Sequence, residues 1–127
     1  MIFIAVALGG ALGAMGRYWL CAYVFPVGVN QFPWGTLLVN VTGCLLIGFL
    51  YSSIGDWAVE KMSLTPYWRA FLSTGFLGGL TTFSTFSLES IVLWQQMNPV
   101  IALTYVISSL VGCLAAVIVG LWLATFI

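Results

Sequence analysis

Histidine is absent from this sequence, and charged side chains are few. Without histidine, the chain lacks the commonest metal ligand and the side chain that usually exchanges protons near neutral pH. Three Lys or Arg and three Asp or Glu give a net charge of zero, so there is no basic patch for nucleic acid. We therefore expect no nucleic-acid partner. The sequence also shows no nucleophile–base pair and no phosphate-binding loop, so we expect no enzyme.

Cysteine is also sparse, with only three residues in the chain. Cys21, Cys44 and Cys113 are odd in number, far apart and without a C-x-x-C pair. Such a pattern indicates neither a disulfide framework nor a zinc site. We interpret all three as small apolar packing residues.

The chain is rich in apolar side chains: 62% of its residues are hydrophobic and 5% are charged. Soluble domains carry about 25% charged residues, so this chain cannot cover a water-facing surface and is predicted to be an integral membrane protein surrounded by lipid. A helical span needs about 20 apolar residues. Four segments qualify, at about 2–25, 34–54, 66–96 and 99–127.

Capping residues followed by proline support these limits. Thr65-Pro66 and Asn98-Pro99 each place a capping side chain before a proline, which is typical of a helix start. No Lys or Arg precedes Arg17 and no A-x-A site follows the first apolar run, so we expect this span to be retained and not cleaved as a signal peptide. The predicted fold is an all-α membrane protein, a single four-span domain covering residues 1–127.

The charges barely specify an orientation in the membrane. With four spans, Lys61 and Arg69 lie near one side and Arg17 near the other. The positive-inside rule needs a clear excess, and two against one is a weak bias. We therefore expect insertion in both orientations and pairing with an inverted copy, as an antiparallel homodimer. One fixed orientation remains the alternative.

The stretch TGFLGGLTTFSTFSLE (74–89) stands out because it is polar and rich in glycine in the middle of the third span. Each glycine lowers helix stability by roughly 1 kcal/mol, so we expect the helix to break around 77–81. At membrane depth the freed backbone groups must be buried in protein or line a wet cavity, where carbonyls can bind a cation. A glycine-rich packing kink is the alternative interpretation.

Polar side chains in several spans suggest a narrow track across the membrane. Thr82, Thr85, Phe86 and Glu89 share one helical face, and Thr36 and Asn40 share another. Tyr105, Ser108 and Ser109 lie in the fourth span, and Arg17 ends the first. An ionisable group within a span is a functional candidate. Hydroxyl and amide donors together with the positive edges of phenyl rings suit a small anion that must shed its water.

At these residues the sequence resembles the Fluc (CrcB) fluoride channel family. The strongest match is GGLTTFSTFSLE (78–89), supported by GGALGAMGRYW (9–19) and WGTLLVNVTGCLLIG (34–48). The resemblance implies a dual-topology antiparallel homodimer with two pores. Its implied function is passive, selective export of fluoride across the bacterial plasma (inner) membrane, which relieves fluoride toxicity.

The resemblance also implies roles for individual residues. Phe83 and Phe86 would be the phenylalanines that line the pore, Asn40 would donate to fluoride, and Arg17 would lie near the entrance. The polar track would hold Thr36, Ser84, Thr85, Glu89, Tyr105 and Ser109. The backbone carbonyls of Gly78 and Thr81 would bind a structural sodium ion at the dimer centre. Position 113 departs from the expectation, because Cys113 stands where the family's track leads us to expect serine.

Two other functions fit a chain of this size. A small proton-coupled multidrug exporter also has four spans, but it places an essential glutamate in the first span, where this sequence has no acid. A non-transporting accessory subunit would need only the faces of small residues that let helices pack closely, and it would leave the polar track unexplained.

Overall fold

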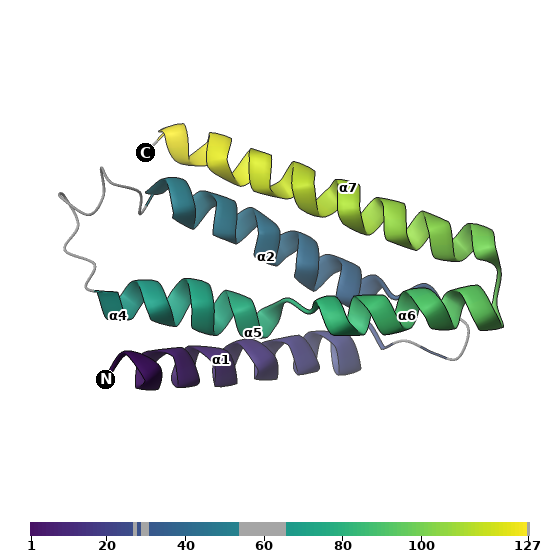
Figure 1. Cartoon of the computed structure of the whole chain (residues 1–127), viewed down its shortest axis with the longest axis horizontal. Helices are drawn as coiled ribbons and strands as arrows, with labels where there is room; N and C mark the ends of the chain where they lie inside the picture. The colour runs from purple at the N-terminus through teal and green to yellow at the C-terminus, as the bar shows by residue number, and fades with distance from the viewer. Residues whose placement is uncertain (27, 29–30, 54–65, 127) are drawn as a thin grey trace.

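The computed structural model is built from long apolar helices that run roughly side by side (Figure 1). It describes residues 1–26, 28, 31–53 and 66–126. Four helical stretches are long and apolar enough to span a membrane, which confirms the predicted all-helical, four-span class: Ile2–Val24, Trp34–Ser52, Pro66–Gln96 and Pro99–Phe126. The predicted connection at 55–65, including the expected cap Thr65, lies outside the described residues.

Each span is made of one or more helical elements. In chain order these are α1 (Ile2–Trp19), η1 (Leu20–Val24), α2 (Trp34–Ser53), α4 (Pro66–Arg69), η2 (Ala70–Leu77), α5 (Gly78–Leu80), α6 (Phe83–Gln96), α7 (Pro99–Leu123) and η3 (Ala124–Phe126). The segments η1 and η2 are π-helical, and η3 is a short 3₁₀ turn. The predicted start of the fourth span is confirmed: the Asn98 side chain accepts a hydrogen bond from the Val100 N–H, with Pro99 in the first turn.

The spans pack as two pairs. In one pair α1 lies along η2 and α5, and in the other α2 lies along α7 (Figure 1). Helix α6 continues the line of α5 and contacts α7, so the third span joins the two pairs. The N-terminus of α1 and the C-terminal end of α7 lie at the same end of the bundle, as an even number of spans requires (Figure 1).

Glycines let both pairs approach closely. A side chain at Gly13 would collide with the Phe76 carbonyl oxygen, and one at Gly75 would meet the Val6 carbonyl oxygen at 2.8 Å. Between α2 and α7, a side chain at Gly120 would collide with the Leu45 carbonyl oxygen. Close backbone approach through small residues is how helices associate where the solvent itself is apolar.

The bundle exposes many large apolar side chains. Large side chains such as Phe3, Leu114 and Ile118 are 82%, 67% and 66% exposed. In water such a surface would drive aggregation, whereas in a bilayer it contacts lipid chains. Together with the four spans, this surface identifies a multi-pass integral membrane protein.

Candidate functional site

The third span contains two residues in extended conformation. Helix α5 ends at Leu80 and α6 begins at Phe83. Between them Thr81 has φ −80° and ψ 156°, and Thr82 has φ −151° and ψ 114°. Thr82 is the N-cap of α6, because its hydroxyl oxygen accepts a hydrogen bond from the Thr85 N–H at 3.2 Å. A local side-chain cap therefore restarts the helix after these two residues.

Asn40 of α2 holds this segment by two hydrogen bonds. Its Nδ2 donates to the Thr82 carbonyl oxygen at 3.1 Å, and its Oδ1 accepts from the Thr82 N–H at 2.8 Å. In a continuous α-helix the Thr82 N–H would bond to the Gly78 carbonyl. The Asn40 side chain takes over this donor, so the Gly78 carbonyl is released from the helical pattern.

A groove with a volume of about 460 Å³ opens beside the extended residues. Its wall includes side chains of α2, of the third span and of α7, and most of them are apolar. The lining residues are Asn40, Gly43, Cys44, Ile47, Ser73, Leu77, Gly78, Thr81, Thr82, Phe83, Phe86, Ser109, Leu110, Cys113 and Leu114.

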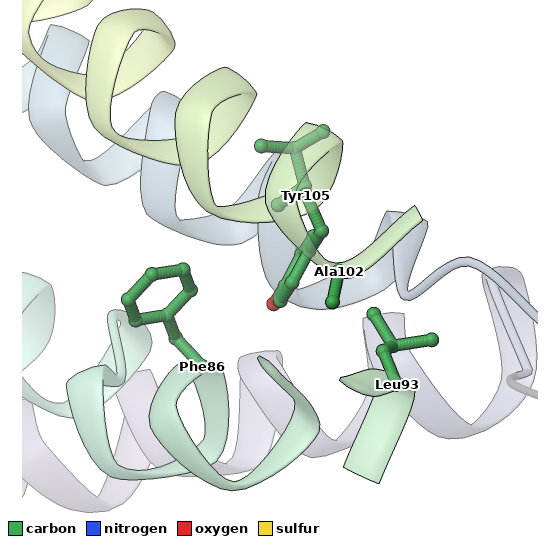
Figure 2. Close-up of a cluster of buried hydrophobic side chains, with 5 residues drawn as sticks. Phe86, Leu93, Ala102 and Tyr105 are labelled. Carbon is green, nitrogen blue, oxygen red and sulfur yellow. The ribbon is translucent and has the colours of Figure 1, made fainter. Parts of the chain in front are cut away.

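The two phenylalanines expected to line the pore both lie on this groove. Phe83 and Phe86 have ring centroids 5.5 Å apart, at an interplanar angle of 46°. Phe83 is 75% exposed, whereas Phe86 is 8% exposed and packs against Tyr105 with centroids 5.4 Å apart. Figure 2 shows Phe86 and Tyr105 projecting toward each other from α6 and α7. The Phe86 ring is therefore packed inside the bundle, whereas the Phe83 ring is exposed on the groove.

Beyond Phe86, a carboxylate joins three helices. Glu89 of α6 accepts hydrogen bonds at both oxygens, from the Thr36 hydroxyl at 2.8 Å and from the Tyr105 hydroxyl at 2.7 Å. Thr36 is 2% exposed and Tyr105 is fully buried. Because Thr36 lies in the first turn of α2, the cluster extends from the groove toward the end of the bundle where α2 begins.

The remaining predicted residues divide into two groups. Ser109 lines the groove, and the hydroxyls of Thr85 and Ser84 lie 3.0 and 3.3 Å from the Thr82 hydroxyl. Arg17 does not line the groove; it is half-buried in the last turn of α1. The structure thus brings together the predicted residues of the second, third and fourth spans, whereas Arg17 is not part of the groove wall.

Sequence reasoning missed two features of the site. The sequence suggested that the helix restarts near Thr82 and that Thr82 shares a face with Glu89, but not that Thr82 bonds to Asn40. Cys44 lines the groove, whereas it was expected to be a packing residue. Cys113 also lines the groove, at the position where the family's track led us to expect serine. The spacing offered a signal: Cys44 follows Asn40 by four positions and Cys113 follows Ser109 by four, which places each pair on one helical face.

Side-chain ligands for a typical metal centre are not gathered here. Within residues 1–26, 28, 31–53 and 66–126, no group of three or more His, Cys, Asp and Glu lies close enough to hold an ion. Gly78 and Thr81, whose main-chain oxygens were expected to bind sodium, both line the groove. Such oxygens suit a hard cation.

Comparison with known proteins covers nearly the whole chain. Residues 4–121 match the family model described as CrcB-like protein, Camphor Resistance (CrcB). A protein of Saccharophagus degradans named fluoride-specific ion channel FluC is 46% identical over 95% of this chain and 87% of its own length. Proteins of the same name from Hahella chejuensis and Rhizobium meliloti are 45% and 43% identical, over 98% and 93% of this chain and 94% and 91% of their own lengths. The chain is therefore a member of the CrcB family.

Proposed function

We propose that this chain is a fluoride-selective ion channel that exports fluoride passively across the bacterial inner membrane. The observation that carries the proposal is the similarity to proteins named as fluoride-specific channels, which runs through every span of this chain. The chain's own residues give the proposal a physical basis, because the match includes the groove and the cluster around Glu89.

The groove offers donors suited to a small anion. Phe83 and Phe86 can turn positive ring edges toward an anion, and Ser109 contributes a hydroxyl. Asn40 keeps one further N–H on Nδ2 beyond the hydrogen bond it gives to Thr82. Several weak donors replace water around an ion without holding it tightly, as conduction requires. The proposed ion path runs along these residues and past Ser84 and Thr85 toward Thr36, Glu89 and Tyr105.

A second copy of the chain would close this groove. Phe83 is 75% exposed in the middle of a membrane span, and Gly78 is exposed beside it. Lipid chains cannot pair with a backbone carbonyl, and irregular backbone at this depth is tolerated only against protein or a wet cavity. Positive charge is nearly equal on the two sides of the membrane, with Arg17 near one side and Lys61 and Arg69 near the other. The chain can therefore insert in both orientations, and an inverted partner can form. We therefore infer an antiparallel homodimer with two pores.

A structural sodium ion would fit the centre of such a dimer. The Thr82 N–H donates to Asn40, so it does not bond to the Gly78 carbonyl as it would in a continuous helix. Thr81 lies on the same groove wall as Gly78. Carbonyl oxygens from two inverted copies would give a hard cation several ligands. The ion would satisfy backbone groups that otherwise lack a partner, so its proposed role is to hold the two copies together.

The function is tested by anion efflux from liposomes that contain the purified protein. Fluoride and chloride are compared side by side, with a cation ionophore present to carry the balancing charge. Fast fluoride loss with negligible chloride loss supports the channel. No fluoride loss from verified, folded protein would overturn it, and proton-coupled uptake of organic cations would then test the exporter.

A second experiment tests the path itself. Asn40→Asp keeps the oxygen that accepts from the Thr82 N–H but places a carboxylate beside the groove. A fixed negative charge repels an anion, so we expect fluoride efflux at neutral pH to fall at least tenfold. Unchanged efflux would remove Asn40 from the ion path.

The dimer is tested by fusing reporters of both sides of the membrane to the C-terminus. Signal on both sides supports dual insertion, and signal on one side alone would refute it. Replacing sodium by a large organic cation during purification should shift the protein from dimer to monomer. A dimer that persists without sodium would argue against the structural ion.

A further inference from the structure

The groove wall holds a pair of thiols. Cys44 of α2 and Cys113 of α7 both line the groove. One turn further along the same two helices, a side chain at Gly48 would collide with the Val117 carbonyl oxygen, so α2 and α7 lie close together here. Both cysteines are free and half-buried. Each lies one helical turn beyond a polar residue of the same wall, Cys44 beyond Asn40 and Cys113 beyond Ser109. The thiols therefore form the next layer of the groove.

Ser109, on the same wall of the groove, has a hydroxyl without a partner among the described residues. Its side chain is 4% exposed. A buried polar group left without a partner costs about 1–3 kcal/mol. Because Cβ atoms four residues apart on a helix are about 5–6 Å from each other, the Ser109 hydroxyl is near enough to bond to a species held at Cys113.

We propose that Cys44 and Cys113 form a two-coordinate site for a soft, thiophilic metal ion, and that its occupancy blocks the proposed ion path. Thiolate sulfur selects soft ions. Two thiolates and one divalent ion such as mercury(II) make a neutral complex, which suits a membrane interior. Tetrahedral zinc needs four ligands, and no third Cys, His, Asp or Glu joins the pair within the part of the chain that the structure describes.

Binding needs no oxidant. Each thiol releases its proton to water, and each sulfur then forms one bond to the metal ion, so one Hg²⁺ consumes two thiols and releases two protons. The bound ion would bridge α2 and α7 within one turn of Asn40 and Ser109. The block of ion flow rests on the proposed function, whereas the metal site itself does not.

The site is tested first by counting thiols, without reference to transport. Purified Cys21→Ser protein retains only the pair, and we expect one equivalent of mercury(II) to remove both free thiols. Cys21→Ser/Cys44→Ser and Cys21→Ser/Cys113→Ser retain one thiol each, and they should release mercury to a competing monothiol at least a hundredfold more readily. Equal retention by these three proteins would overturn the site. Thiol loss accompanied by cross-linked chains on a non-reducing gel would also overturn it, because the ion would then bridge two copies.

The block is tested by fluoride efflux in a chloride-free medium, since chloride competes for mercury(II). Each variant is compared with its own rate before metal is added. We expect Cys21→Ser protein to lose at least nine-tenths of its efflux, with recovery upon addition of a dithiol, and both single-thiol variants to keep most of theirs. Tight binding by the pair without loss of efflux would refute the block. Absence of efflux from every protein would refute the proposed function and leave the thiol count to decide the site.

Discussion

Asn40→Ala tests whether the two hydrogen bonds to Thr82 hold the extended segment in place. The substitution removes an acceptor that lies 2.8 Å from the Thr82 N–H and a donor that lies 3.1 Å from the Thr82 carbonyl oxygen. Thr82 is 7% exposed, so water does not replace the lost partners freely. At about 1–3 kcal/mol for each buried group left unpaired, we expect the free energy of unfolding to fall by roughly 2–4 kcal/mol after some relaxation.

The matched control is Asn98→Ala, which removes the same atoms from the N-cap of α7. The Asn98 side chain accepts one exposed hydrogen bond, from the Val100 N–H at 2.8 Å. Loss of such a cap costs typically about 1 kcal/mol. The assay is equilibrium unfolding in mixed detergent micelles, followed by tryptophan fluorescence and circular dichroism. If Asn40→Ala costs no more than Asn98→Ala, Asn40 does not hold the segment, and the reasoning is wrong.

Three further substitutions test packing, the buried carboxylate and the ion path. Phe86→Ile keeps apolar bulk but removes the ring, so fluoride efflux should fall about tenfold, equivalent to ~1.4 kcal/mol. The control is Leu88→Ile, at an exposed position of the same helix. Equal rates in the two variants would exclude a role for the ring. Tyr105→Phe removes the hydroxyl that donates to the Glu89 carboxylate at 2.7 Å, so it should lower the free energy of unfolding by about 1.5–3 kcal/mol. No loss of stability would mean that the Glu89 carboxylate finds another donor. Gly13→Ala forces a methyl group against the backbone of η2 and should lower the free energy of unfolding by about 1–3 kcal/mol. In the control Gly16→Ala, the new methyl group meets its nearest atom at 3.9 Å and should be tolerated. Equal losses of stability in the two variants would contradict the close packing.

The span limits could be predicted because they depend on local properties. Hydrocarbon content sets the length of each span, and Pro99 with its capping Asn98 marks the start of the fourth span in both sequence and structure. The π-helical segment 70–77 could not be predicted in this way. Its apolar residues read equally well as an α-helix, and its neighbour across the close approach, α1, lies far away in the sequence.

The candidate residues could be chosen by type, but their partners could not. The polarity of Asn40 and Glu89 marked them as candidates, yet their hydrogen bonds reach 42 and 53 positions along the chain, to Thr82 and Thr36. Such pairs depend on how α2 crosses the third span, which no local pattern encodes. The family resemblance was confirmed by the comparisons, whereas the roles of individual residues in ion passage stay predictions.

The position of the extended residues within the third span has a consequence for inversion. The span runs from Pro66 to Gln96, so equal numbers of its residues lie on either side of Thr81. With this span centred in the bilayer, turning the whole chain over would leave Thr81 at the same depth and would move the cluster around Glu89 to the opposite leaflet. Two inverted copies would share one central plane of irregular backbone and carry one carboxylate cluster in each leaflet. The proposed dimer would therefore present the same surface to both sides of the membrane.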